Sequence, residues 1–133
     1  MNLRIIYPTD DGVAIIIPAA ECGLTIEEVA KKDVPAGVAY KIVNDDEVPS
    51  DRTFRNALKY DLTVDMPKAQ GITKERLRAE RAPLLTALDV QYQRATEDGR
   101  DTTIIISEKQ RLRDVTKLAD AATTLDELKA LSA

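Results

Sequence analysis

One segment, residues 66–97, constrains the fold of this chain more than any other part of the sequence. Large apolar side chains recur along it at spacings of seven, four and four residues, the pattern of one face of an α-helix. They are Leu77, Leu84, Leu88 and Tyr92, and Leu85 and Ala95 widen the stripe. Polar residues such as Glu80 and Asp89 lie off this stripe. We therefore predict an amphipathic helix from Met66 to about Glu97.

A helix of this length is long for a chain of 133 residues. Some thirty helical residues extend about 45 Å, whereas a compact globule of this size is roughly 36 Å across. The helix is therefore expected to bend or to protrude. Gly71 and Pro83 lie inside it and are candidate positions for a bend. A protruding helix with an apolar stripe needs a partner surface, which a second copy of the chain could also supply.

A second helix is expected after the turn Asp98–Asp101, so that the two helices form a hairpin. Its apolar residues recur at spacings of seven, three and four, and they are Ile105, Leu112, Val115 and Ala119. Two starting positions are open for this helix. The apolar spacing that begins at Ile105 fits a start near Thr102, whereas the β-branched run Thr102–Ile106 and a capping-box pattern at Ser107–Gln110 fit a start at Glu108. We favour the start near Thr102.

The N-terminal residues carry the pattern of a β-hairpin. Residues 3–7 and the apolar run Val13–Ile17 flank the turn Thr9–Gly12, and Pro8 interrupts the first strand. Asp11-Gly12 is expected to supply the positive φ that a tight hairpin turn requires. These residues therefore predict two antiparallel strands.

A helix and a third strand are expected to follow this hairpin. The capping box Thr25–Glu28 predicts a short helix that ends near Lys32. Residues 38–43 then predict a strand with Tyr40 and Ile42 on one face. The first fifty residues thus form a ββαβ unit.

The predicted fold class is α+β, with two parts. Residues 1–62 form the small ββαβ domain, in which Phe54, the only phenylalanine, is expected to fill the core. Residues 63–133 form the helical hairpin and a short terminal helix. The capping box Thr124–Glu127 opens that last helix, which ends near Leu131.

The sequence offers little that could carry out catalysis. Histidine is absent, and with it the commonest general base and metal ligand. Neither a phosphate-binding glycine loop nor a metal-ligand spacing occurs. The acidic pairs Asp10-Asp11, Glu27-Glu28 and Asp45-Asp46 are explained as turn residues or as an exposed helix face. We therefore expect a protein that is not an enzyme and that uses neither cofactor nor metal.

The charge pattern excludes some classes of partner. The net charge is −4, and basic residues alternate with acidic ones, so nucleic acid is not an expected partner. The apolar run Val13–Ile17 is too short for a signal-peptide core or a membrane span. The single cysteine, Cys22, cannot form an internal disulfide. A soluble protein made in a reducing cytoplasm is expected.

Several stretches of the chain resemble a family of small proteins from the tail regions of bacteriophages and prophages, encoded near tail-fibre genes. The resemblance rests on residues 3–8, 34–37, 40–43, 49–57, 64–66, 68–69, 76–85, 88–89 and 109–114. Within these, the series Arg78-x-x-Arg81, Leu84-Leu85, Leu88-Asp89 and Leu112-Arg113-Asp114 is also similar to the helical part of phage tail assembly chaperones. Those chaperones commonly carry tryptophan, which this chain lacks.

The resemblance implies a role at the phage tail or its fibres. The first hypothesis is a structural or adaptor component of the tail-fibre region, located in the virion tail after synthesis in the host bacterial cytoplasm. The second is an assembly chaperone for tail or fibre proteins that is not retained in the virion. The third is a host-directed phage protein. In the first two, the partners are tail or tail-fibre proteins.

The hairpin is the expected binding element, because its apolar stripes are the largest on the chain. The candidate partner-binding residues are Leu77, Leu84, Leu85, Leu88, Tyr92, Leu112 and Val115.

Overall fold

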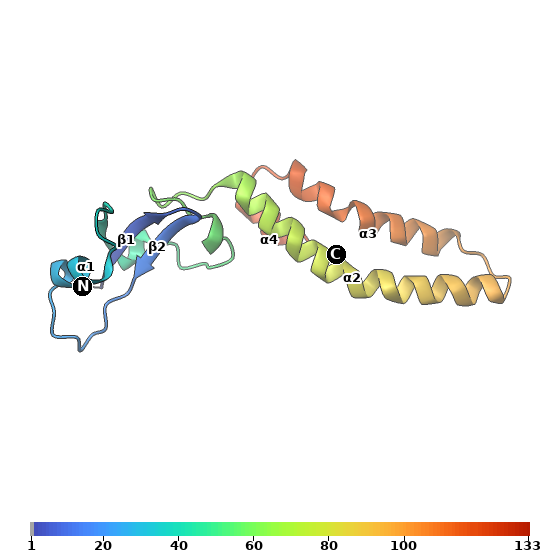
Figure 1. The fold of residues 1–133 in the computed structure, drawn as a ribbon. Coiled ribbons are helices and arrows are strands. Elements are labelled where there is room, and N and C mark those ends of the chain that lie inside the picture. The colour runs from blue at the N-terminus through green and yellow to red at the C-terminus, as the bar shows by residue number, and fades with distance from the viewer. Residues whose placement is uncertain (1) are drawn as a thin grey trace. The chain divides into compact units, whose positions relative to one another are not determined.

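The structure, a computed structural model, describes residues 2–133. The chain divides into two compact units, the first ending at Asp65 and the second comprising Met66–Ala133. A three-stranded antiparallel sheet lies in the first unit and long helices form the second, which confirms the α+β class (Figure 1).

The boundary between the units lies slightly later than the predicted end of the first domain at residue 62. Residues 63–65 belong to the first unit because their backbone is bonded into it. The amide of Lys59 donates to the Thr63 carbonyl at 2.8 Å, and the amide of Asp65 donates to the Ala57 carbonyl at 2.8 Å. Leu58 and Val64 also form an antiparallel bridge.

The sheet has β1 (Leu3–Thr9) at its centre, with β2 (Gly12–Ile16) on one side and β3 (Lys41–Asn44) on the other. Strands β1 and β2 form the predicted hairpin, and the pairing runs from Ile5 opposite Ile16 to Thr9 opposite Gly12. Strand β3 pairs with the first half of β1, from Leu3 to Ile6. Both neighbours of β1 are antiparallel to it.

The hairpin turn differs from the prediction in one detail. Because Thr9 pairs with Gly12, the two turn residues are Asp10 and Asp11. Among residues 9–12, positive φ occurs only at Gly12, with φ +155°, and not at Asp11. A Cβ at Gly12 would lie 3.1 Å from the carbonyl oxygen of Leu58. Gly12 is therefore needed both for its backbone conformation and for this close approach.

Pro8 was expected to interrupt the first strand, yet β1 continues to Thr9. The register explains why. Residues in an antiparallel pair alternate between hydrogen-bonded and non-hydrogen-bonded positions. Thr9 and Gly12 close a two-residue turn as a hydrogen-bonded pair, so Pro8 opposite Val13 is a non-hydrogen-bonded pair. An N–H at Pro8 would point toward the β3 side, where the pairing has already ended at Ile6.

Helix α1 (Ile26–Asp33) covers one face of the sheet. Its predicted capping box is present: the Thr25 hydroxyl accepts from the Glu28 amide at 3.2 Å, and a Glu28 carboxylate oxygen accepts from the Thr25 amide at 2.7 Å. The small core on this face consists of Ile5, Val29, Ala30 and Val34, packed against by Tyr7, Ile16, Ile26 and Val38. Burial of each large member stabilises the unit by about 1.5–3 kcal/mol.

The third strand begins later than the predicted residue 38. Gly37 has φ +80°, and the Val38 amide donates to the Pro35 carbonyl, so a turn occupies this stretch. The side chain of Val38 packs into the α1 core. Tyr40 therefore lies outside β3, although Tyr40 and Ile42 are both exposed.

The last part of the first unit supplies buried side chains without regular strands. The 3₁₀ turns η1 (Asp45–Glu47) and η2 (Arg55–Ala57) occur here, and η2 contacts β2. Phe54 is 6% exposed, which confirms its predicted place in the core. Ala57 and Leu58 are buried beside it in the sequence.

The second unit begins with α2 (Met66–Glu97), whose ends coincide with the predicted ones. Helix α3 (Thr103–Ala121) returns along α2, and α4 (Leu125–Ala130) follows after a short connection. The start of α3 supports the favoured position near Thr102. The Asp101 carboxylate accepts from the Thr103 hydroxyl at 2.7 Å and from the Thr103 amide at 3.0 Å, and these two bonds hold the pKa of Asp101 below its usual range.

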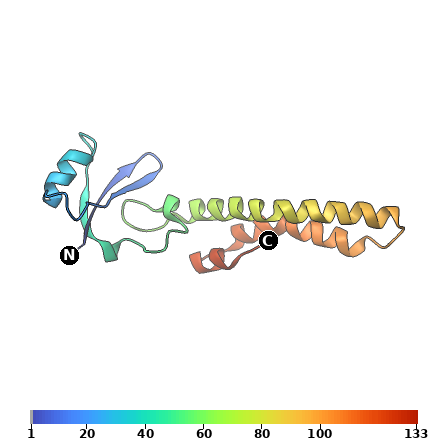
Figure 2. The ribbon, with the colours of Figure 1, turned by 90° about the horizontal axis from the view of Figure 1, so that it is seen from below.

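Polar contacts fix the antiparallel register of α2 and α3. Lys74 forms an ion pair with Asp120. Further along, the Arg81 guanidinium donates to the carbonyl of Arg113 at 2.9 Å. The helices therefore lie side by side over most of the length of α3, as both views show (Figures 1 and 2).

Candidate protein-binding surface

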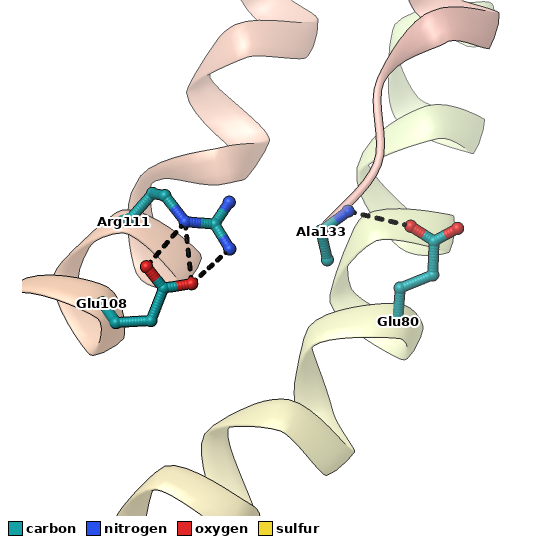
Figure 3. A network of polar contacts seen from close by, with 4 residues as sticks. All are labelled: Glu80, Glu108, Arg111 and Ala133. Atoms are coloured by element: carbon teal, nitrogen blue, oxygen red, sulfur yellow. Dashed lines mark hydrogen bonds and ion pairs between the residues drawn. The ribbon is translucent and has the colours of Figure 1, made fainter. Parts of the chain in front are cut away.

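Helix α4 covers only part of the α2–α3 hairpin. Arg76 of α2 donates to the Leu128 carbonyl at 3.1 Å, and Gln70 donates to the Ala122 carbonyl at 3.2 Å. The chain then ends beside Glu80, whose carboxylate accepts from the Ala133 amide at 3.3 Å (Figure 3). In Figure 2, α4 lies along the first half of α2, and the hairpin beyond it consists of two helices.

The carboxylate of Glu80 also forms an ion pair with Arg76 at 2.9 Å. Arg76 and Glu80 together hold the C-terminal segment at Leu128 and at Ala133. The part of the hairpin past Glu80, residues 81–111, is called the distal hairpin below.

Side chains are buried mainly where α4 is present, and in the distal hairpin only Ala95 is buried. Three residues in the first half of α2 are at most 1% exposed: Ala69, Thr73 and Leu77. They are matched by buried residues of the returning chain, which are Leu112, Val115, Ala119, Ala122 and Leu128. The buried Thr73 hydroxyl donates a hydrogen bond to the Ala69 carbonyl at 2.9 Å. A dry core therefore exists in the three-helix part of the unit.

The distal hairpin leaves large apolar side chains uncovered. Leu84 is 43% exposed and Ile104 is 82% exposed. Leu84 lies seven residues after Leu77, two turns along the same face of α2. Ile104 lies eleven residues before Val115, three turns along the same face of α3. The face that α4 covers thus continues into the distal hairpin, where no helix of this unit lies over it.

The structure divides the seven candidate residues into two groups. Leu77, Leu112 and Val115 are at most 2% exposed within the unit. They belong to its core and are closed to a partner, which corrects their assignment as binding residues. The periodicity of the sequence could not separate the groups, because it does not tell which part of the hairpin α4 covers.

The other four candidates lie in the distal hairpin. Leu84 and Tyr92 are exposed, at 43% and 39%, whereas Leu85 and Leu88 are half-buried. Their role in binding a partner stays a prediction.

Three further exposed apolar residues of the distal hairpin were not among the candidates. They are Val90, Ile104 and Ile106. Ile104 and Ile106 lie in the β-branched run at the start of α3, the run that left the start of this helix open in the sequence. Once this run is helical, the side chains of Ile104 and Ile106 point to opposite sides of α3, and only Ile104 shares the face of Val115.

Charged residues hold the two helices of the distal hairpin together. The Lys109 ammonium lies 2.6 Å from the Asp89 carboxylate and 5.2 Å from the centre of the Tyr92 ring. On the α3 surface, Arg111 donates to both carboxylate oxygens of Glu108 (Figure 3). The hydrogen bonds between Glu108 and Arg111 lower the pKa of Glu108 and raise the pKa of Arg111.

The distal hairpin is electrically balanced. Residues 81–111 contain five arginine or lysine residues and five aspartate or glutamate residues. Exposed apolar side chains in a region without net charge favour contact with protein surfaces rather than with nucleic acid.

Other kinds of site were sought along the same chain. Over residues 2–133, histidine, cysteine, aspartate and glutamate side chains form no group that could hold a metal ion. Over that range, no helix has the length and apolar character needed to cross a membrane. Cys22 is exposed and has a free thiol.

Comparison with known proteins gives no family. No protein-family model, no curated protein and no solved structure matches the chain. Its function is therefore inferred from its own residues and surfaces.

Proposed function

We propose that the protein binds another protein through the uncovered face of its distal hairpin, and that it does so as a structural or adaptor component of a bacteriophage tail. The observation that carries the binding proposal is the continuation of the α4-covered face into Leu84 and Ile104. The tail setting rests on the resemblance of residues such as 49–57 and 76–85 to small phage tail-region proteins.

The geometry favours an amphipathic helix of the partner as the bound element. Helix α4 already packs this way: it places Leu128, 0% exposed, against the hairpin, and its Leu128 carbonyl accepts from Arg76. A partner helix laid along the distal hairpin would extend that third layer. Apolar anchors at helical spacing are the usual means by which a groove between helices takes up a helix.

A pair of matched variants tests the binding face. Leu84→Asp places a charge on the uncovered face, whereas Val90→Asp places one at an equally exposed position, 44% against 43%, about 120° away around α2. We expect Leu84→Asp to weaken binding at least about tenfold, since a large apolar anchor is worth roughly 1.5–3 kcal/mol. Val90→Asp is expected to bind as the parent does.

The measurement is mass spectrometry of purified phage particles that carry the parent protein or either variant, with circular dichroism as the control for folding. The parent and Val90→Asp should be retained in particles and Leu84→Asp should be lost. Equal retention of both variants contradicts the binding face. Absence of the parent protein from particles contradicts a virion component.

The second candidate function is the assembly chaperone, favoured by the similarity of the series between Arg78 and Asp114 to such proteins. It requires the parent protein to be absent from particles and bound to unassembled tail or fibre subunits. Leu84→Asp should then weaken binding to those subunits, and Val90→Asp should not. A host-directed protein is left as the function if neither particles nor unassembled subunits bind the chain.

A further inference from the structure

The two edges of the sheet in the first unit differ in how they are protected. Strand β3 carries the charged Lys41, and its Asn44 amide donates to a Glu47 carboxylate oxygen at 2.7 Å. Charged side chains and capped amides are the usual means of preventing an edge strand from pairing with another chain. Strand β3 is therefore protected at Lys41 and at Asn44.

Strand β2 contains no charged side chain, and the η2 segment contacts it near Gly12. The stretch from Gly12 to Ala20 contains no charged residue, and the strand itself is mostly β-branched. All five strand residues are partly exposed. Ile17, directly after the strand, is 59% exposed. An uncharged edge strand of high β-propensity is suited to pairing with a further strand.

The register shows which backbone groups this edge offers. Gly12, Ala14 and Ile16 occupy the hydrogen-bonded positions toward β1, because Thr9 and Gly12 close the turn and positions alternate. The N–H and C=O groups of Val13 and Ile15 therefore point away from β1. Among the backbone hydrogen bonds that residues 2–133 make outside regular elements, neither residue takes part.

We propose that β2 pairs in antiparallel fashion with β2 of a second copy of the chain, about a twofold axis at Ala14. The outward groups of Val13 and Ile15 are placed symmetrically about Ala14. Val13 of one copy then lies opposite Ile15 of the other, and every outward N–H meets a C=O. The inference is independent of the proposed function, since it uses no residue of the α2–α3 helical hairpin.

Side-chain size and charge fit this arrangement. On the axis, Ala14 faces its own copy as a non-hydrogen-bonded pair, the position at which facing residues approach most closely, and alanine is the smallest side chain of the strand after Gly12. The acidic turn residues Asp10 and Asp11 fall opposite the uncharged segment that follows β2 in the second copy. No like charges are therefore brought together.

The resulting sheet has six strands in the order β3-β1-β2-β2-β1-β3. Its two outer edges are both β3, which Lys41 and the Glu47 contact protect. Pairing therefore stops at two copies, as expected for a twofold contact that uses the same surface on both partners. The partner is a second copy rather than an open series of chains.

Charge substitution at Ala14 tests the pairing in the full chain. Ala14→Lys and Ala14→Glu each place like charges opposite one another on the axis, whereas an equimolar mixture places opposite charges there. We expect the parent chain to have twice the mass of 14.7 kDa in sedimentation equilibrium. Each variant alone is expected to associate about tenfold more weakly than the mixture, from the like-to-opposite change of a cross-strand pair.

Two controls separate this result from other causes. Ala39→Lys adds a charge at an exposed position outside the sheet and is expected to leave the dimer intact. Leu84→Asp is also expected to leave it intact, so failure of one proposal does not affect the other. A monomeric parent chain overturns the proposal. So does a dimer that persists in both Ala14 variants, or a mixture of folded variants that does not regain association.

Discussion

Gly12 is the residue on which the hairpin of the first unit depends most. Its φ of +155° is a conformation that residues with a side chain rarely adopt, and the carbonyl oxygen of Leu58 lies 3.1 Å from the position of a Cβ. That neighbour is backbone and cannot rotate away. The backbone of the turn at Gly12 therefore packs closely against the segment that contains η2.

Replacement of Gly12 by alanine is predicted to destabilise the chain by about 1–3 kcal/mol, the usual cost of a strained backbone conformation. Gly37→Ala is the matched control: it also has positive φ, +80°, but nothing lies within 4 Å of a Cβ there. Urea denaturation should show a larger loss for Gly12→Ala. Equal losses would mean that the contact with Leu58 has no effect on stability.

Capping residues were the features best predicted from the sequence. Thr25 and Glu28 form the expected capping box, and so do Thr124 and Glu127 before α4. The amides of Thr123 and Thr124 donate to Glu127 and lower its pKa. Such contacts span three or four residues, so the local sequence contains all that determines them.

At the scale of elements, α2 runs unbroken through Pro83. Proline has no N–H, so the carbonyl of Ala79 lacks its helical donor at this point. Pro83 is exposed, and the hairpin packing of α2 on α3 tolerates the loss.

Pro83→Ala is therefore predicted to stabilise the second unit by about 1–3 kcal/mol, because it restores the missing helical hydrogen bond and removes a poor helix former. Gly71→Ala, also exposed in α2 and with nothing within 4 Å of a Cβ, should give a smaller gain of about 0.5–1 kcal/mol. Thermal denaturation followed by circular dichroism measures both. A lower melting temperature for Pro83→Ala would show that the helix requires proline at this position.

Elements were predicted well where their signals are periodic or local, and less well where distant contacts decide. The limits of α2 follow from its own pattern. The late start of β3 depends on Val38 packing into the α1 core, and the unit boundary depends on the bridge between Leu58 and Val64. Burial of Leu77 and exposure of Leu84 depend on where α4 packs, which periodicity does not encode.

At the scale of the whole chain, charge is divided unequally between the units. Residues 1–65 contain seven basic and twelve acidic residues, whereas residues 66–133 contain twelve basic and eleven acidic ones. The first unit therefore carries a net charge of −5 and the second a net charge of +1.

The second unit is predicted to fold as a separate fragment, residues 66–133. Its core residues, among them Leu77, Leu112 and Leu128, all lie within this range. The fragment should show a helical circular dichroism spectrum and a cooperative thermal transition. Leu128→Ala in the fragment should lower its stability by about 2–5 kcal/mol. A fragment without cooperative unfolding would show that this unit needs residues 1–65.

The residues from α4 to Ala133 pack on α2 only as far as Glu80, which has a consequence for how the second unit moves. Backbone amides around Leu77 lie in the three-helix part of the unit, so their exchange with solvent deuterium requires the whole unit to open. Amides around Leu88 and Ile105 lie in a two-helix ribbon and can exchange through local fraying from the Gly99 end. The stretch that offers its apolar side chains to a partner is therefore also the stretch whose shape a partner can most easily adjust.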